Sequence, residues 1–171
     1  MTSRVLSASL LACTALLFAC AEPVPEDQTA AGAEVAEQAA DAADPCNPAN
    51  LAAEALASGT KILAGVTLAA STPIADILAK PDDFAGKNIR IEGVIVEICQ
   101  SQGCYVRLQD PAGNKLNLKV VDGELDFREL VKTGQYAVGE GMFSKEGEHG
   151  AQLDIMKAGA MVGTTVCLIT S

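Results

Sequence analysis

The residues with the most evident chemistry are two cysteines, Cys99 and Cys104, separated by Gln-Ser-Gln-Gly. They lie between two segments in which apolar and polar residues alternate, so we expect them to face each other across a hairpin neck. Two cysteines can form a disulfide when their Cα atoms are roughly 4.4–6.8 Å apart. A structural disulfide is therefore the leading prediction for the pair, with Gly103 supplying the positive φ of a tight loop.

A second hypothesis is a metal site that includes His149, the only histidine of the chain. In the barrel predicted below, the loop that holds His149 lies beside the loop between Cys99 and Cys104. Two thiolates and an imidazole are a soft ligand set suited to Cu(I) or Zn, and Met142 or Met156 would add a weak fourth ligand. The plainer interpretation of His149 is a solvated turn residue.

A third hypothesis is thiol redox chemistry, in which the pair cycles with its disulfide. The pair lacks the Cys-X-X-Cys spacing at a helix start that lowers a thiol pKa, and Arg107 is the only base close to it in sequence. The loop and the strand after it also offer a candidate ligand face, made of Gly103, Tyr105 and Arg107. The sequence contains no phosphate-binding loop, nucleophile elbow or second histidine, so no enzyme activity is predicted.

The first 19 residues have the pattern of a secretory signal peptide, with Arg4 followed by a short apolar run. The next residues, Leu17-Phe18-Ala19-Cys20, resemble the lipobox of bacterial lipoproteins, which are cleaved before a cysteine that is then lipidated. That resemblance implies lipid on Cys20, with Cys13 as a less suitable alternative. It predicts an address in the bacterial cell envelope, facing the periplasm and anchored by lipid, with the outer membrane favoured.

Residues 20–45 form an acidic segment built largely from Ala, Glu, Asp, Gln and Pro, and it contains no basic residue. Such a composition cannot bury enough apolar surface to offset its ordering entropy, so we predict a disordered linker. The whole chain has a net charge of −10, but from Cys46 onward 15 acidic and 11 basic residues remain. This part of the sequence is slightly acidic and contains no cluster of basic residues that could bind phosphates, so nucleic-acid binding is not expected.

Four cysteines remain in the exported chain once the signal peptide and Cys20 are set aside. An oxidising compartment favours disulfides among them. Beside the predicted Cys99–Cys104 bridge, Cys46 and Cys167 could form a long-range bridge that ties the two ends of the domain together.

Alternating apolar residues predict a mainly β domain over residues 71–171. The expected strands are 88–98, 104–110, 115–121, 135–143 and 151–156. Gly93, inside the first of them, suggests a bulge or a tight bend. Three consecutive strands, an interruption over 122–133 and two further strands are the order of a small OB-like five-stranded Greek-key barrel. A small sandwich is the alternative architecture.

Before the barrel, residues 46–70 are predicted as a partly helical extension. Asn47 and Pro48 give a helix start signal, and Gly59 marks its end. A second short helix is expected directly after Pro73.

The chain also resembles the bacterial family DUF4920 over residues 71–159. The resemblance is carried by Gly86-Lys87, by the strand that begins at Ile89, by Cys99, by Gly103-Cys104-Tyr105 and by Val138-Gly139-Glu140-Gly141. Tyr105 stands where a tryptophan is more usual. The resemblance implies an OB-like barrel on an exported protein, often lipid-anchored, and implies no established activity.

Together these observations predict a lipid-anchored envelope binding module with its site at the Cys99/Cys104 loop. Its expected partners are the membrane, through the lipid, and a small ligand, a peptide or an envelope protein. Soft-metal binding and thiol–disulfide redox activity are the two alternatives, and no cofactor other than Cu(I) or Zn is suggested.

Overall fold

The computed structural model describes residues 44–167. The predicted signal peptide, Cys20 and nearly all of the acidic linker lie outside the described residues. Within residues 44–167, no helix is long and apolar enough to cross a membrane.

The domain is mainly β, with six strands and four short helices in the described part of the chain. The strands are β1 (Thr60–Leu63), β2 (Asn88–Ile98), β3 (Tyr105–Gln109), β4 (Lys115–Lys119), β5 (Gln135–Gly147) and β6 (Gly150–Val166). The helices are α1 (Pro48–Ser58), α2 (Ile74–Ala79), α3 (Pro81–Phe84) and α4 (Phe127–Leu130).

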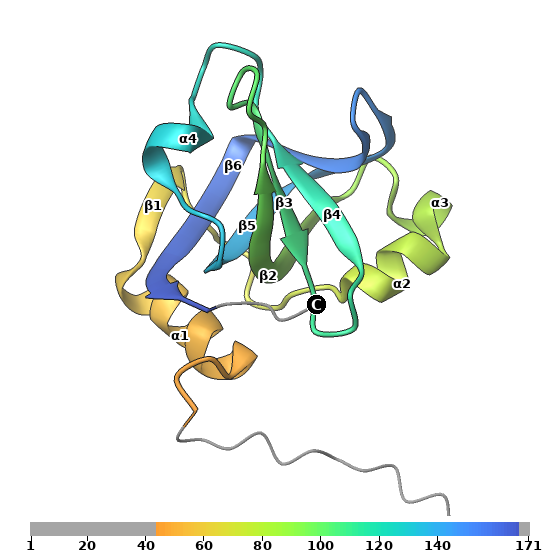
Figure 1. The fold of residues 1–171 in the computed structure, drawn as a ribbon. Helices are drawn as coiled ribbons and strands as arrows, with labels where there is room; N and C mark the ends of the chain where they lie inside the picture. The colour runs from red at the N-terminus through yellow and green to blue at the C-terminus, as the bar shows by residue number, and fades with distance from the viewer. Residues whose placement is uncertain (1–43, 168–171) are drawn as a thin grey trace, which may run out of the picture. The chain divides into compact units, whose positions relative to one another are not determined.

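Strand pairing closes five of the six strands into a ring. β2 pairs with β3 and β5, β3 pairs with β4, and β6 pairs with β5, all antiparallel. The ring is completed where β4 and β6 pair in parallel. This order, with α4 between the third and fourth barrel strands, confirms the predicted OB-like Greek-key barrel (Figure 1).

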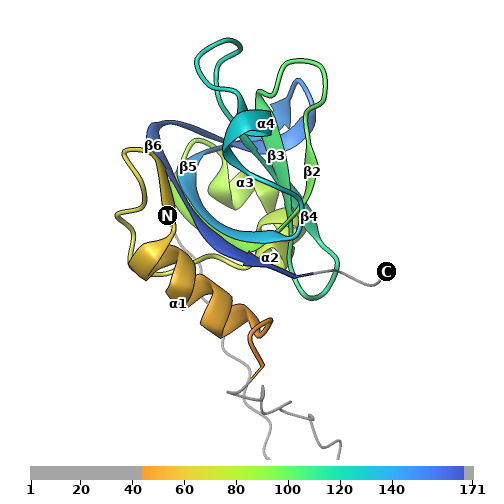
Figure 2. The same ribbon diagram turned by 60° about the vertical axis from the view of Figure 1, so that its left-hand side comes forward.

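The structure adds one strand that the sequence left undecided. β1 pairs along β6, outside the ring. Figure 2 shows β5 and β6 as long curved strands, with α1 outside the barrel near β6. The segment predicted as an extension thus supplies one helix and one strand that pack on the barrel.

The first barrel strand was predicted at its observed bounds, but Gly93 has a different role from the one expected. The register of β2 against β3 shifts between Ile95 and Glu97, not at Gly93. A Cβ atom at Gly93 would lie 2.5 Å from the carbonyl oxygen of Gln109. Glycine is needed there because the β3 backbone approaches closely.

The last part of the chain differs most from prediction. The last predicted strand ended at residue 156, but β6 has 17 residues and continues through Gly159. β5 runs on to Gly147, so the gap between the predicted strands 135–143 and 151–156 shrinks to Glu148 and His149. β6 bends where its register against β5 is irregular. Glu140 pairs with Gly159, whereas Met142, two residues further along β5, pairs with Asp154.

The first helix begins as predicted. The Asn47 side chain accepts a hydrogen bond from the backbone N–H of Ala49 at 2.9 Å, and Pro48 occupies the first turn. Just before the cap, Cys46 is bonded to Cys167 with a Cα–Cα distance of 5.8 Å. The predicted long-range bridge between the two ends of the domain is therefore present.

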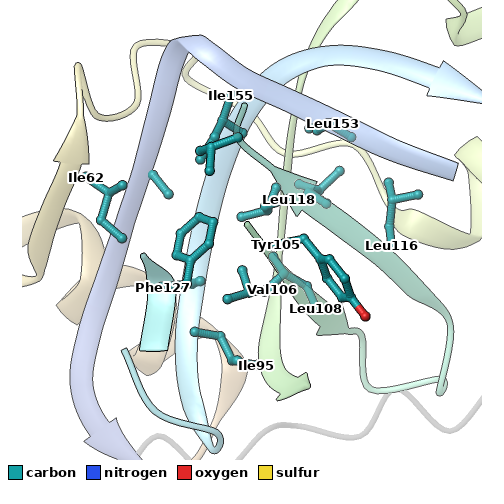
Figure 3. Packing of buried hydrophobic residues seen from close by; sticks show 14 of the residues in the cluster. Ile62, Ile95, Tyr105, Val106, Leu108, Leu116, Leu118, Phe127, Leu153 and Ile155 are labelled. Carbon is teal, nitrogen blue, oxygen red and sulfur yellow. The ribbon is translucent and has the colours of Figure 1, made fainter. Parts of the chain in front are cut away.

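The barrel interior is filled by aliphatic side chains from all of its strands, and α4 contributes one aromatic ring. Phe127 is 1% exposed and points into this core (Figure 3). Its burial fixes α4 against the end of the barrel that holds the cysteine loop.

Candidate functional site

The two candidate cysteines lie at the neck of the loop between β2 and β3. The backbone N–H of Cys99 donates to the carbonyl of Tyr105, and that of Gly103 donates to the carbonyl of Cys99, both at 3.0 Å. The Sγ atoms of Cys99 and Cys104 are 3.7 Å apart. Both residues are buried free thiols, so the structure shows the pair in reduced form, whereas the sequence favoured a bridge.

The loop is held from outside by the segment that leads into α4. Phe127 donates its backbone N–H to the Gly103 carbonyl at 2.9 Å. The Arg128 guanidinium donates to the carbonyls of Gln100 at 2.8 Å and Ser101 at 3.3 Å. In Figure 1 this segment and the β2–β3 loop lie toward the same end of the barrel. The position of the thiols therefore depends on α4, which is remote in sequence.

Gly103 meets two structural requirements at this junction. Its φ is +65°, and a Cβ atom there would lie 1.9 Å from Asp126 Oδ1. A side chain would therefore be strained in its own backbone and would displace the carboxylate that binds Arg128.

We expect Gly103→Ala to lower the free energy of unfolding by about 2 kcal/mol, because it combines left-handed strain with a steric clash. Urea unfolding of the full chain measures the loss. Gly113→Ala is the matched control, since Gly113 has a φ of +88° and open space around it, so only about 1 kcal/mol is expected. Equal losses in the two variants would rule out a contribution from the clash.

The two thiols have different electrostatic surroundings. Burial by itself raises the pKa of the Cys99 thiol, but hydrogen bonds from the Ser101 hydroxyl, from the backbone N–H groups of Gln102 and Cys104 and from the Cys104 thiol lower it to about 6. The Ser101 oxygen is 3.4 Å from the Cys99 sulfur. Cys99 is therefore largely a thiolate at neutral pH, the form that acts as nucleophile.

Burial instead dominates at Cys104 and raises its pKa, and the hydrogen bonds to Cys99 and Asp122 act in the same direction. Lys119 opposes them and lowers the Cys104 pKa. The pair thus consists of one ionised and one protonated sulfur in contact. This is the arrangement that thiol–disulfide exchange uses for attack and resolution.

His149 does lie at this end of the barrel, but its ring packs on Tyr105. The two ring centroids are 4.6 Å apart, and the His149 carbonyl accepts from the Asn117 side chain at 3.0 Å. Among the described residues, no three His, Cys, Asp or Glu side chains form a group able to hold a metal ion. The three-ligand set of Cys99, Cys104 and His149 is therefore not formed here.

The two methionines considered as a fourth ligand occupy different parts of the barrel. Met142 pairs with Asn88 at the start of β2, whereas Cys99 follows the end of that 11-residue strand. Met142 is 48% exposed and lines a cavity with Lys157. Met156 is partly buried and packs against the core cluster that also contains both thiols. The position of Met142 does not support it as a thioether ligand in a metal site with the thiols.

The candidate ligand face of Gly103, Tyr105 and Arg107 is largely occupied by internal contacts. The Tyr105 hydroxyl donates to Glu97 at 2.7 Å, which raises the Tyr105 pKa, and Arg107 forms an ion pair with the same carboxylate at 2.7 Å. Tyr105 is only 9% exposed. These residues build one wall of the site and present little open surface to a ligand.

The sequence interpretation missed three residues that surround the thiols. Lys119 and Asp122 interact electrostatically with Cys104, and Arg128 holds the loop and interacts electrostatically with Cys99. Proximity in sequence points only to Arg107 as a base near the pair, because Lys119 and Arg128 are brought near the loop by the fold. No spacing in the sequence signals either of these contacts.

No family model and no curated protein sequence matches the chain, so the resemblance to DUF4920 stays a prediction. Among solved structures, the hypothetical protein YgiW from E. coli is 13% identical, with a TM-score of 0.34 over 50% of this chain and 83% of its own. A protein from Leishmania major that carries the provisional name aspartyl-tRNA synthetase is 12% identical, with a TM-score of 0.40 over 64% of this chain and 25% of its own. At these TM-scores the matches carry no argument about this protein.

Proposed function

We propose that this chain is a thiol–disulfide exchange module of the bacterial cell envelope, anchored by lipid on Cys20. The observation that carries the proposal is the contact between two free thiols, with Cys99 and Cys104 Sγ atoms 3.7 Å apart. The low pKa of Cys99 supports its role as the attacking sulfur. The Cys46–Cys167 disulfide is consistent with an oxidising compartment, as the signal pattern predicts.

The exchange needs a disulfide of a peptide or envelope protein as co-reactant. The Cys99 thiolate attacks one sulfur of that disulfide, forming a mixed disulfide and releasing the first partner thiolate. Cys104 then loses its proton and attacks the Cys99 sulfur, which forms the Cys99–Cys104 bond and releases the second partner thiolate. The partner disulfide gains two electrons and leaves as two thiolates, which take up protons from solvent according to their own pKa. The pair loses two electrons and the single proton of Cys104. The reverse sequence returns the pair to its thiols.

This proposal takes up the thiol–disulfide redox alternative predicted from the sequence, in place of the leading prediction of a binding module with a structural bridge. A structural bridge and a soft-metal site are the alternative interpretations of the cysteine pair. The bridge requires a bond that resists reduction, and the metal site requires a third ligand that His149 does not supply in this conformation.

The test uses the purified lipidated chain in detergent, equilibrated with reduced and oxidised glutathione at a series of ratios. Free thiols are then alkylated and the cysteines are assigned by mass spectrometry. We expect the Cys99–Cys104 pair to interconvert between thiols and disulfide while Cys46–Cys167 stays bonded. We also expect Cys104→Ser to accumulate glutathione on Cys99, and Cys99→Ser to react at least 100-fold more slowly.

The pH dependence gives a second measurement. Cys99 alkylation by iodoacetamide is expected to reach half its maximal rate near pH 6, far below the value for an ordinary thiol. A Cys99–Cys104 bond that no glutathione ratio reduces would establish the structural bridge instead. Stoichiometric Cu(I) binding that blocks alkylation and is lost in His149→Ala would establish the metal site.

A further inference from the structure

The loop between Cys99 and Cys104 is attached to α4 through its carbonyl groups. Arg128 Nη1 donates to the carbonyl oxygens of Gln100 at 2.8 Å and Ser101 at 3.3 Å. Both loop residues are exposed, so burial does not fix their conformation. Their orientation therefore depends on the hydrogen bonds that the guanidinium donates.

One of these two residues also contacts the attacking sulfur. Ser101 Oγ is 3.4 Å from Cys99 Sγ, while the Ser101 carbonyl accepts from Arg128. Because a thiolate has no proton to donate, the hydroxyl is the donor whenever Cys99 is ionised. A hydrogen bond to the charged form stabilises that form, so the orientation of Ser101 bears directly on the amount of thiolate.

The guanidinium is itself held in place by its own helix. Arg128 Nε is 2.9 Å from Asp126 Oδ1 and Nη2 is 2.5 Å from Oδ2, which leaves Nη1 for the loop. Next to it, Phe127 is buried in the barrel core and donates its backbone N–H to the Gly103 carbonyl. Only a planar fork can bind a carboxylate and two carbonyls in this way, and a lysine ammonium cannot replace it.

Other ionisable groups also face Cys99. The Cys104 sulfur is 3.7 Å away, and the Tyr105 side chain and the Arg128 guanidinium interact with Cys99 electrostatically. The Arg128 charge is balanced by the Asp126 carboxylate 2.5 Å from it. We therefore expect the guanidinium to act on Cys99 through the loop that it holds more than through its net charge.

We propose that Arg128 is a positioning residue for the exchange reaction, in which its guanidinium, oriented by Asp126, keeps the Ser101 hydroxyl at the Cys99 sulfur. The inference rests on the proposed exchange function and deepens it. Without Arg128 the loop carbonyls lose their donor, and Ser101 turns away from the sulfur. Cys99 then keeps its proton to a higher pH, and its attack on a partner disulfide slows where the thiolate is the minor form.

The first test measures Cys99 alkylation by iodoacetamide against pH in the full lipidated chain, with mass spectrometry to assign the cysteine. We expect Arg128→Gln to raise the pH of half-maximal rate by about one unit, the effect of losing a hydrogen bond to a charged group. Arg128→Lys keeps the charge without the fork and is expected to behave like Arg128→Gln. Lys132→Gln, which removes an exposed charge just after α4, is the matched control and should leave the profile unchanged.

A double-variant cycle tests whether Arg128 acts through Ser101. Ser101→Ala is expected to give a similar shift of about one unit, since it removes the same hydrogen bond. The chain that carries Ser101→Ala and Arg128→Gln together is expected to shift no further than either single variant. Additive shifts would overturn the inference, because Arg128 would then act on Cys99 independently of Ser101.

The exchange step itself is followed as mixed-disulfide formation between oxidised glutathione and Cys99 in the Cys104→Ser chain. At pH 5, Arg128→Gln is expected to slow the reaction about threefold, because a tenfold smaller thiolate fraction is partly offset by the greater nucleophilicity of a more basic thiolate. At pH 9, where Cys99 is ionised in both chains, no slowing is expected.

The two proposals fail in different ways. A folded Arg128→Gln chain with the wild-type alkylation profile would overturn the role of Arg128, even if the pair exchanges with glutathione. Full recovery in Arg128→Lys, or equal slowing at pH 5 and pH 9, would overturn it too, because charge alone or a general disruption would then explain the effect. A pair that never exchanges would overturn the function and, with it, the role of Arg128 in exchange, even where alkylation shifts as expected.

Discussion

Replacing Cys46 and Cys167 together by alanine is expected to lower the free energy of unfolding by about 4 kcal/mol. The bridge joins residues 121 positions apart, so it closes nearly the whole described domain into one loop. In the chain-entropy account, loops of this size give the largest stabilisation, because the unfolded chain loses most conformational freedom. The bridge also fixes the start of α1 beside the end of β6, where Cys167 is buried in a cluster with Leu51 and Ala55.

Urea unfolding monitored by circular dichroism measures this loss. A chain carrying Cys99→Ser and Cys104→Ser is the matched control, since it keeps the bridge and lacks the free thiols. Dithiothreitol is expected to destabilise that control to the level of the Cys46/Cys167 double variant and to have no further effect on the double variant. A double variant as stable as the control would show that the bridge does not stabilise the domain.

Glu140→Ala is expected to cost about 3 kcal/mol, because a buried carboxylate at the centre of several hydrogen bonds is removed. Glu140 is 3% exposed. It accepts from the backbone N–H groups of Thr67 at 2.6 Å and Leu68 at 2.8 Å, and from the Asn88 amide at 2.8 Å. Its loss leaves these donors without an acceptor and releases the segment that crosses from β1 to α2.

The same carboxylate predicts a pH dependence. Burial raises the Glu140 pKa, but the hydrogen bonds from Leu68, Thr67 and Asn88 outweigh it, and the net pKa is lower than usual. A lowered folded-state pKa means that the stabilisation is complete above the ordinary value of 4.5 and is lost as the pH falls through the folded-state pKa. The stability of the wild type is therefore expected to decline below about pH 5, and that of Glu140→Ala to decline less.

Urea unfolding at pH 7 and at intervals down to pH 3 measures both effects. Glu146→Ala, an exposed glutamate on the same strand, is the control and is expected to cost less than about 0.5 kcal/mol. A Glu140→Ala variant whose stability falls with pH as steeply as that of the wild type would contradict this account.

The strands with period-two patterns were predictable because one face of each must be buried in a small barrel. β2 has its predicted bounds, and α4 lies inside the stretch that lacked alternation. The course of β6 was not predictable in the same way. Its bend leaves Lys157 exposed and places Gly159 against the carbonyl of Ile62, so buried and exposed residues do not alternate there. Pairing with β5 nevertheless keeps β6 a single continuous strand.

The candidate site was likewise predictable only in part. Strand order alone places the thiols and the His149 turn at the same end of the barrel. Which groups surround the thiols depends on side-chain directions, and these place His149 on Tyr105 and the Arg128 guanidinium at the carbonyls of the cysteine loop. No spacing in the sequence distinguishes those outcomes, because each contact joins positions on separate elements.

The closed ring also bears on self-association. Within the described residues, the five barrel strands each have a partner on both sides, and β1 adds an edge only four residues long. Unpaired strand edges are the usual template for adding a foreign strand. If lipid anchoring crowds copies of this domain on a membrane, as proposed, the ring offers neighbours little backbone with which to extend a sheet between molecules.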